Sequence, residues 1–448
     1  METKRFLIVG NGAAGATAAE VIRQNDSWAS ITMISAEPYP MYSRPGLAYV
    51  LMREIPYKQI FARRPEWYEQ MRIDLVMGEA VGVDTARRHV VLADGRFLPY
   101  DKLLIATGAR ATPSPYPGGD LDGVVYLDTL DGTRDLMKKA KRAKRAVVIG
   151  GGITALEMTE GLSHLGIETH YFVRRDRLWS KVFNKEEAAI LDERMREHGV
   201  HIHYNTEIEE IVGGRKNKVA GVKIKGSGEF FKCDLVGMAI GVKPVVDVVK
   251  GSSIKTDRAI LVNEYLQTSA PDVYAAGDCA QVYDRWTDSY MLDILWPSAV
   301  AEARIAALNM LGEKRPYVKG SPFNACLLFG LHITTIGQVN PRIDDEGAAV
   351  LQHLSRGSSE VWYTYPRHYH SAWSGDGPNT IRMILDGDRL VGALIMGEQN
   401  LADPLRYIIE NNIDISSWKD DLAAGGVRLR RRLAQFWYQQ SSTVQLAS

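Results

Sequence analysis

Two glycine-rich turns constrain the fold of this chain more strongly than any other feature of its sequence. They read Gly10-Asn11-Gly12-Ala13-Ala14-Gly15 and Gly150-Gly151-Gly152-Ile153-Thr154-Ala155. Each follows an apolar run typical of a buried strand and precedes a helix-forming run, so that the backbone can approach a pyrophosphate at a helix N-terminus. Two such turns predict two bound dinucleotides, most simply FAD and a nicotinamide nucleotide. The predicted contacts in these turns are Gly10, Gly12, Ala13, Ala14, Gly15, Gly150, Gly152, Ile153 and Thr154.

Composition narrows the class of protein. The 448 residues, 45% of them hydrophobic, can fill the cores of three domains. Lys+Arg and Asp+Glu both total 54, so there is no overall basic field to attract nucleic acid. No run approaches the ~18 apolar residues of a membrane span, and no signal segment precedes the first strand. We expect a cytoplasmic, soluble protein without nucleic-acid or membrane partners.

The residues around the first turn form a strand–helix–strand unit. The pattern predicts a strand over 5–10, a helix over 13–24 and a second strand over 30–35. Glu37 follows, 22 residues after Gly15, where dinucleotide folds place an acid on the ribose hydroxyls. A solvated loop carboxylate is the alternative for Glu37.

The organisation then repeats. Alternating residues from Val81 to Pro99 predict a β-meander, and a buried strand follows that ends in Ala106-Thr107-Gly108. Strand–helix–strand units and a second meander recur over 145–245, which indicates an internal duplication.

A further strand closes on Gly277-Asp278 before a helix. Together with Ala106-Thr107-Gly108 and the two glycine turns, it resembles the two-dinucleotide flavoproteins, the FAD- and NAD(P)-dependent pyridine nucleotide oxidoreductases, over about residues 4–410. The resemblance implies an α/β fold of two Rossmann-like three-layer domains and an α+β C-terminal interface domain. The implied parts are an FAD domain (1–112 and 246–312), an NAD(P)H domain (113–245), the interface domain (313–415) and a basic, aromatic helical tail (416–448).

The same resemblance assigns further cofactor contacts. They are Val81, Ala106, Thr107, Gly108, Gly241, Gly277, Asp278 and Trp296. For Asp278 an ordinary helix N-cap is a second interpretation, compatible with the first, and for Trp296 a place in the core is the alternative.

The stretch Arg44-Pro45 favours one branch of the family. Disulfide reductases carry a redox cysteine in this region, but here no cysteine precedes Cys233, so a thiolate nucleophile beside the flavin is excluded. Arg44 and Pro45 resemble the Arg-Pro of rubredoxin, ferredoxin and nitrite reductase flavoproteins, in which the arginine neighbours FAD. A surface turn charge is the alternative for Arg44.

Two residues are candidates for the region where hydride is transferred. Ferredoxin reductase-like members place a lysine where this chain has Tyr49, and that lysine commonly pairs with a glutamate that matches Glu157. The glutamate is therefore present without its lysine.

Arginines at the end of the strand after the second turn indicate NADPH. NAD-using proteins place an acid there, whereas this chain has Val173 followed by Arg174 and Arg175. Arginines suit a 2′-phosphate. Relatives that use NAD also carry an arginine at the first position, so Arg175 discriminates and NADH stays open.

Other groups carry less chemistry. Three widely spaced cysteines exclude a disulfide scaffold and a cysteine-ligated cluster. His368 and His370 have no third ligand beside them, so we predict no metal site. Residues 428–438 join arginines to aromatic residues on one expected helix, either packed on the body or available to an acidic carrier.

These observations favour an FAD-dependent NAD(P)H oxidoreductase that passes hydride to flavin and electrons on to a rubredoxin- or ferredoxin-like protein. The C-terminal domain resembles the third domain of the nitrite and rubredoxin reductase branch, which often forms an interface, so we expect a homodimer. An NAD(P)H oxidase or quinone reductase is the first alternative. A nucleotide-binding assembly or signalling protein with little turnover is the second.

Overall fold

The computed structural model describes residues 4–284, 288–339, 369–376, 379–418, 420–421 and 426–445, with the backbone alone for 369–376 and 441–445. The described residues divide into two compact units. The first holds residues 4–172 and the described residues of 206–319, and the second holds 173–205 and those from 320 onward. The predicted NAD(P)H segment, 113–245, therefore contributes to both units. The boundaries given above for the FAD domain, the NAD(P)H domain, the interface domain and the tail stay predictions.

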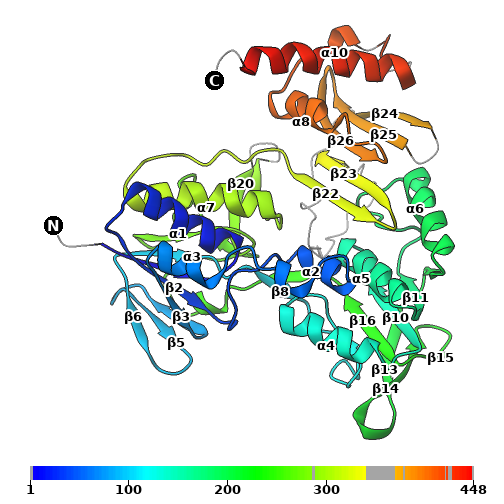
Figure 1. The fold of residues 1–448 in the computed structure, drawn as a ribbon, viewed down its shortest axis with the longest axis horizontal. Helices are drawn as coiled ribbons and strands as arrows, with labels where there is room; N and C mark the ends of the chain where they lie inside the picture. The colour runs from blue at the N-terminus through cyan, green and yellow to red at the C-terminus, as the bar shows by residue number, and fades with distance from the viewer. Residues whose placement is uncertain are drawn as a thin grey trace. The chain divides into compact units, whose positions relative to one another are not determined.

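The first unit contains a parallel sheet in the order β19-β7-β1-β2-β3 (Figure 1). Its strands are β1 (Arg5–Val9), β2 (Ser30–Ser35), β3 (Ile73–Met77), β7 (Lys102–Ile105) and β19 (Val273–Ala275). Consecutive residues of the central strand, Phe6, Leu7 and Ile8, are all buried, as expected where both faces of a parallel sheet are covered. Helices α1 (Ala13–Asn25) and α7 (Trp296–Leu311) pack against each other beside it.

A second parallel sheet in the same unit repeats this plan, in the order β11-β10-β16-β9. Its strands are β9 (Val124–Val125), β10 (Arg145–Gly150), β11 (Glu168–Val173) and β16 (Leu235–Ala239), and its helices are α4 (Leu130–Ala140) and α5 (Ile153–His164). The strand before each glycine turn lies between two parallel neighbours in both sheets. The predicted duplication and fold class are confirmed.

The two segments that connect the first parallel sheet with the second form strands that pair with each other. β8 (Ala109–Ala111) leaves the first sheet and β17 (Val242–Pro244) leaves the second, and they form an antiparallel two-stranded sheet. The Thr107 hydroxyl donates to the carbonyl of Val245 at 2.6 Å. These contacts hold the carboxyl edges of the two sheets together within the first unit.

Smaller elements complete the first unit. Both predicted meanders are present, β4 (Ala80–Asp84), β5 (His89–Leu92) and β6 (Phe97–Pro99), and β13 (Ile208–Gly213), β14 (Val219–Ile224) and β15 (Phe230–Lys232). A third small sheet contains β18 (Ile260–Leu261), β20 (Ala280–Asp284) and β21 (Ser289–Met291). The short helices are α2 (Gly46–Leu51), α3 (Pro65–Gln70) and the 3₁₀ turns η1 (Tyr57–Gln59), η2 (Arg215–Asn217) and η3 (Asp247–Val249).

The second unit is built on an antiparallel sheet in the order β22-β23-β26-β25-β24. Its strands are β22 (Phe323–Leu328), β23 (Leu331–Gly337), β24 (Tyr369–Asp376), β25 (Asn379–Asp386) and β26 (Arg389–Met396). The unit also contains β12 (His201–Tyr204), α6 (Lys185–Glu197), α8 (Ala402–Glu410), η4 (Ser416–Trp418) and α10 (Gly426–Gln445). An ion pair between Arg382 on β25 and Glu187 on α6 is almost fully buried.

The predicted tail helix is α10, and it packs on the second unit. Leu429 and Leu433 are buried, and the Phe436 ring lies 5.1 Å from that of Trp418. Arg428 and Arg431 are exposed. The packed arrangement, with arginines toward solvent, is therefore the one observed. None of the helices in the described ranges combines the length and apolar character that crossing a membrane requires.

Candidate functional site

The glycines of the first turn differ in what surrounds them. A Cβ atom on Gly10 would lie 2.0 Å from the carbonyl oxygen of Ala106, and one on Gly15 would lie 2.0 Å from that of Gly10. These two glycines are therefore required by the close approach of β1, β7 and α1. A Cβ atom on Gly12 would meet no atom within 4 Å. Protein packing does not require a glycine there, but a pyrophosphate approaching the backbone would.

The second turn resembles the first at its first glycine, and its second residue, Gly151, stands where the first turn has Asn11. A Cβ atom on Gly150 would lie 2.1 Å from the carbonyl oxygen of Ala239, whereas one on Gly151 would meet nothing within 4 Å. Ile153 is buried at the start of α5, and Thr154 is half-buried. The two turns thus share a first glycine that is required by a neighbouring strand, Gly10 at the end of β1 and Gly150 at the end of β10.

The helices after these turns begin without side-chain caps. α1 begins after Gly12 and α5 after Gly152, and neither has a capping side chain or an acidic residue in its first turn. By contrast, the Thr129 hydroxyl caps α4. Uncapped N–H groups and the positive end of the helix dipole favour an anion such as phosphate. Ala13 and Ala14 lie in the first turn of α1, at this position.

The first sheet gathers most of the other predicted FAD contacts at one edge. β1, β7 and β19 are parallel neighbours, so the residues after them, Gly10, Ala106–Gly108 and Gly277-Asp278, lie at the same edge. The Asp278 carboxyl is half-buried and, within the described residues, has no hydrogen-bond partner in another residue. Burial raises its pKa to about 6, with Asp293 adding and Arg44 opposing.

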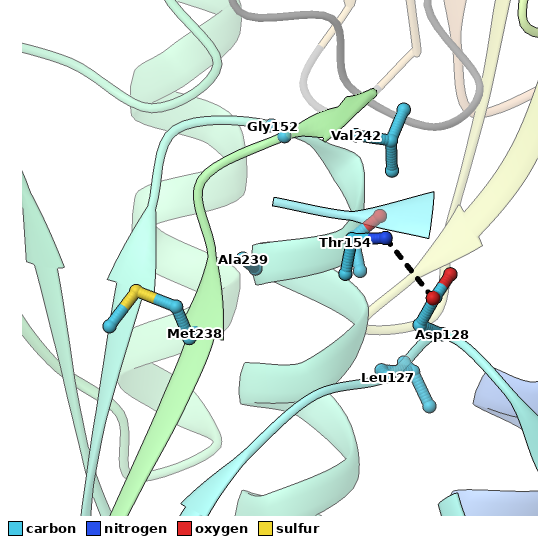
Figure 2. Close-up of a pocket in the computed structure, with 9 residues that line it drawn as sticks. Leu127, Asp128, Gly152, Thr154, Met238, Ala239 and Val242 are labelled. Carbon is cyan, nitrogen blue, oxygen red and sulfur yellow. Dashed lines mark hydrogen bonds between the residues drawn. The ribbon is translucent and has the colours of Figure 1, made fainter. Parts of the chain in front are cut away.

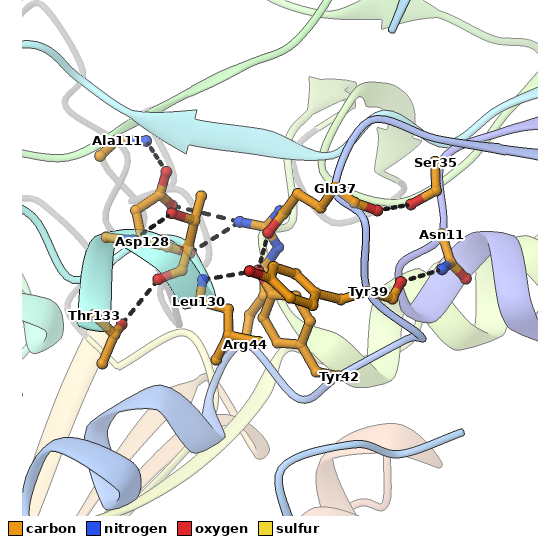
Figure 3. Close-up of polar contacts among 12 residues, drawn as sticks. Asn11, Ser35, Glu37, Tyr39, Tyr42, Arg44, Ala111, Asp128, Leu130 and Thr133 are labelled. Carbon is orange, nitrogen blue, oxygen red and sulfur yellow. Dashed lines mark hydrogen bonds and ion pairs between the residues drawn. The ribbon is translucent and has the colours of Figure 1, made fainter. Parts of the chain in front are cut away.

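A polar cluster connects Glu37 to the segment between β9 and α4 (Figure 3). Arg44 donates to a Glu37 carboxylate oxygen at 2.6 Å and to the Asp128 carbonyl at 2.9 Å. The Tyr42 hydroxyl also donates to Glu37, at 2.7 Å, and accepts from the backbone of Leu130. Arg44 is thus an ion-pair partner whose side chain is 32% exposed, and its role as an FAD neighbour stays a prediction.

A pocket lies beside the second glycine turn, at the carboxyl edge of the second sheet (Figure 2). It is lined by Ala111, Leu127, Asp128, Gly152, Thr154, Met238, Ala239, Gly241 and Val242. Ligands of open α/β sheets bind at this edge. The predicted contacts Gly152, Thr154 and Gly241 are brought together here.

Comparison with known proteins identifies the family. Residues 4–293 match the pyridine nucleotide-disulphide oxidoreductases. The chain belongs to this family.

Individual relatives support the assignment. An NAD(P)H nitrite reductase of Bacillus subtilis (strain 168) is 30% identical over 421 residues, which cover 93% of this chain and 48% of that protein, so the chain spans about half its length. A rhodocoxin reductase of Rhodococcus erythropolis is 32% identical over 314 residues, covering 70% of this chain and 73% of that protein. The crystal structure of the ferredoxin reductase for the CYP199A2 system from Rhodopseudomonas palustris has the same fold, with a TM-score of 0.82, 24% identity and coverage of 94% and 97%.

Membership in the pyridine nucleotide-disulphide oxidoreductase family supports FAD and a nicotinamide dinucleotide as cofactors. The open position at Gly12, the two uncapped helices and the Asp278 carboxyl fit two dinucleotides at the two sheet edges. The assignment of individual residues to each cofactor remains a prediction.

The cysteines of this family member are unsuited to thiol chemistry. Cys279 is fully buried, its thiol donates to the carbonyls of Ile105 and Ala276, and burial raises its pKa. Burial raises the pKa of Cys233 to about 12, and Cys326 is half-buried. His368 lies outside the described residues, and His370 is described by its backbone alone.

Helices α2 and α5 carry the two candidates for the hydride-transfer region. A Cβ atom on Gly161 of α5 would lie 2.5 Å from the Leu51 side chain of α2, so the helices touch at this point. Glu157 is one helical turn from Gly161, and burial raises its carboxyl pKa to about 8, with Glu160 adding to the effect. Tyr49 is two residues from Leu51 and so faces a different direction. The placement of Tyr49 and Glu157 in the hydride-transfer region stays a prediction.

The remaining predicted contacts are dispersed. Pro45 is exposed before α2, Val81 is exposed on β4, and Trp296 is half-buried at the start of α7. Arg174 and Arg175 are exposed after β11 in the second unit.

Sequence reasoning missed a buried charged network behind the first sheet edge. Glu302 accepts from the Gly277 amide at 2.7 Å. Lys319 pairs with Asp284 at 2.8 Å and lies 3.9 Å from Asp293, all three side chains being at most 1% exposed. Glu302 interrupts an alanine-rich helix, and that is the one signal that could have drawn attention to it.

Proposed function

We propose that this chain is an FAD-dependent NAD(P)H oxidoreductase that takes hydride from NAD(P)H and passes electrons to a small redox protein of the rubredoxin or ferredoxin type. The observation that carries the proposal is the pair of glycine turns that end parallel strands and precede uncapped helices, with an open Cβ position at Gly12 in the first of them. When bound, FAD supplies the chemistry that accepts a hydride and releases electrons singly. The relatives named rhodocoxin reductase and ferredoxin reductase support a protein acceptor.

The chain's own residues would bind and orient the cofactors. Asp278 and Glu37 supply acceptors for hydroxyl groups of FAD, and the α1 N-terminus supplies donors for its phosphates. Gly152 and Thr154 perform the equivalent role for NAD(P)H in the pocket of Figure 2. No thiol takes part, because the chain has three cysteines and none precedes Cys233.

The deciding experiment is anaerobic stopped-flow absorbance of the purified protein with NADPH and, separately, NADH. Fast bleaching at about 450 nm, where oxidised flavins absorb, is the expected result. Slow or absent bleaching with both nucleotides would instead favour a binding or signalling protein. Reoxidation by rubredoxin or ferredoxin faster than by dioxygen or a quinone would establish the acceptor class, and the reverse order would make the protein an oxidase or quinone reductase.

We also propose NADPH as the preferred nucleotide, a homodimer as the assembly and the cytoplasm as the location. The exposed Arg175, and the absence of an acid at Val173, support the preference for NADPH. The ratio of the two bleaching rates tests it, and light scattering of the purified protein tests the assembly.

A further inference from the structure

A cluster of positively charged side chains lies at one end of the second parallel sheet. It is formed by two segments of the first unit, the end of α4 with the residues that follow it (Figure 1) and the 3₁₀ turn η2 with the residue after it. All its members are exposed, and none has an ion-pair partner among the described residues: Lys138, Lys141, Arg142, Lys144, Arg215, Lys216 and Lys218. We call these residues the basic patch.

The fold brings the two segments together around Asp122. Its carboxylate lies 3.1 Å from Nζ of Lys139 on α4, and its backbone amide donates to the carbonyl of Asn217 in η2 at 2.9 Å. The hydrogen bond from Lys139 lowers the pKa of Asp122, and the charges of Lys218 and Lys138 add to this effect. Cations of both segments therefore act on the same carboxylate, although the segments lie far apart in the sequence.

Local structure explains only part of this concentration of charge. Cations at the end of α4 are favoured by the helix dipole, but that reason does not apply to η2. Lys216 has a φ of 58°, a left-handed conformation in which glycine or asparagine is favoured. Crowded cations without ion-pair partners also repel one another in the free protein. A negatively charged partner would relieve that repulsion.

The basic patch lies at the edge of the second sheet opposite the pocket of Figure 2. Lys144 precedes β10, and its amide donates to the carboxylate of Asp234, which precedes β16. Asp122 likewise precedes β9, a parallel neighbour of β16. Gly152 of the pocket follows the other end of β10, a strand of 6 residues and so about 20 Å long. A partner on the basic patch can therefore bind without covering this pocket.

The surroundings of the basic patch favour a compact acidic partner over an extended polyanion. The chain has no net charge, so the rest of it carries a matching excess of carboxylates, which would repel a nucleic-acid duplex or an anionic membrane reaching beyond the patch. None of the large apolar side chains that are exposed in the described residues belongs to either segment. The patch therefore has no group to insert into lipid or to stack on bases. Arg142 and Arg215 can instead bind carboxylates in bidentate fashion.

We propose that the basic patch binds an acidic segment of a partner protein, at a site separate from the pocket at the carboxyl edge of the second sheet. This inference goes beyond the proposed function and does not depend on it, because the patch contains none of the predicted cofactor contacts.

The test measures binding of an oligoglutamate peptide to the full-length, FAD-loaded protein by fluorescence anisotropy, with a dye that emits outside the flavin range. We expect saturable binding that weakens as salt is added. Lys141→Glu combined with Lys216→Glu, one change in each segment, should weaken binding at least about tenfold. The matched control is Lys255→Glu combined with Lys314→Glu, two exposed lysines of the first unit outside the patch, which should change the affinity by less than about twofold.

Three results would overturn the inference. One is an unchanged peptide affinity in the variant with Lys141→Glu and Lys216→Glu. Another is tighter binding of a DNA duplex or of phosphatidylglycerol vesicles than of the peptide, which would assign the basic patch to nucleic acid or to a membrane. The third is competition between the peptide and NADP⁺, which would place the peptide at the pocket. Bleaching by NADPH tests the proposed function separately, because the patch variant should be reduced at the wild-type rate.

Discussion

The Gly277 amide donates a hydrogen bond to the carboxylate of Glu302, with 2.7 Å between nitrogen and oxygen. Glu302 lies on α7, and Gly277 precedes the predicted FAD residue Asp278 after β19. The carboxyl is buried, and burial raises its pKa well above the ordinary value for glutamate. The bond therefore fixes the loop that carries Asp278 against α7.

Replacement of Glu302 should separate the hydrogen bond from the charge. We expect Glu302→Gln to retain FAD, because its amide oxygen can still accept from Gly277. Glu302→Ala leaves a buried N–H group without an acceptor, which costs about 1–3 kcal/mol, and FAD should then bind at least about tenfold more weakly. FAD content and Tm of the two purified variants measure this, and an alanine variant that holds FAD like the wild type would show that the bond does not position the loop.

Replacing Gly12 and Gly15 of the first turn by valine should have different effects on stability and on FAD binding. Gly12→Val places its side chain in open space, so the apoprotein should keep its Tm but bind no FAD and be colourless. Gly15→Val forces a side chain against the Gly10 carbonyl, so its Tm should fall whether or not FAD is added. A yellow Gly12→Val protein with normal FAD content would show that this turn is not the flavin site.

Charge reversal at Arg175 should change nucleotide preference. We expect Arg175→Glu to raise the KM for NADPH about tenfold or more and that for NADH less than about twofold, because a carboxylate repels the 2′-phosphate. Arg174→Glu is the comparison variant, and because NAD-using relatives also carry an arginine at that position, it should affect both nucleotides alike. Steady-state kinetics with both nucleotides measures this, and equal effects on both would remove the argument for NADPH.

The backbone turns were predictable from the sequence, whereas the polar networks were not. The glycine spacing around residues 10 and 150 is set by contacts within a few residues and one neighbouring strand, so it is visible in the sequence. The Glu302–Gly277 and Lys319–Asp284 contacts join residues 25 and 35 positions apart. No periodicity marks such partners, because only the packed fold brings them together.

FAD affinity should depend on pH through Asp278. Its pKa, about 6 in the unliganded protein, lies above the ordinary value because the carboxyl is partly withdrawn from water. A hydroxyl of the cofactor would donate a hydrogen bond to the carboxylate form of Asp278, so protonation of Asp278 should weaken FAD binding. We therefore expect the affinity for FAD to fall by up to about tenfold per pH unit below pH 6 and to be independent of pH above it. FAD titrations from pH 5 to pH 8 measure the profile. Asp278→Asn should bind FAD more weakly at pH 8 and show no such slope, and a variant that retained the slope would assign it to another group.

The buried ion pair of Arg382 and Glu187 should stabilise the second unit cooperatively, so that the effects of replacing its two members are not additive. Arg382 donates to both Glu187 oxygens, at 2.7 and 3.0 Å, and to the Val182 carbonyl. Arg382→Met leaves a buried carboxylate without its cation, which costs about 3–5 kcal/mol. The double variant with Glu187→Gln should recover much of that loss, because glutamine can still accept from Asn184 at the start of α6. Thermal unfolding of the single and double variants gives the coupling directly, and additive losses would mean that the two residues stabilise the unit independently.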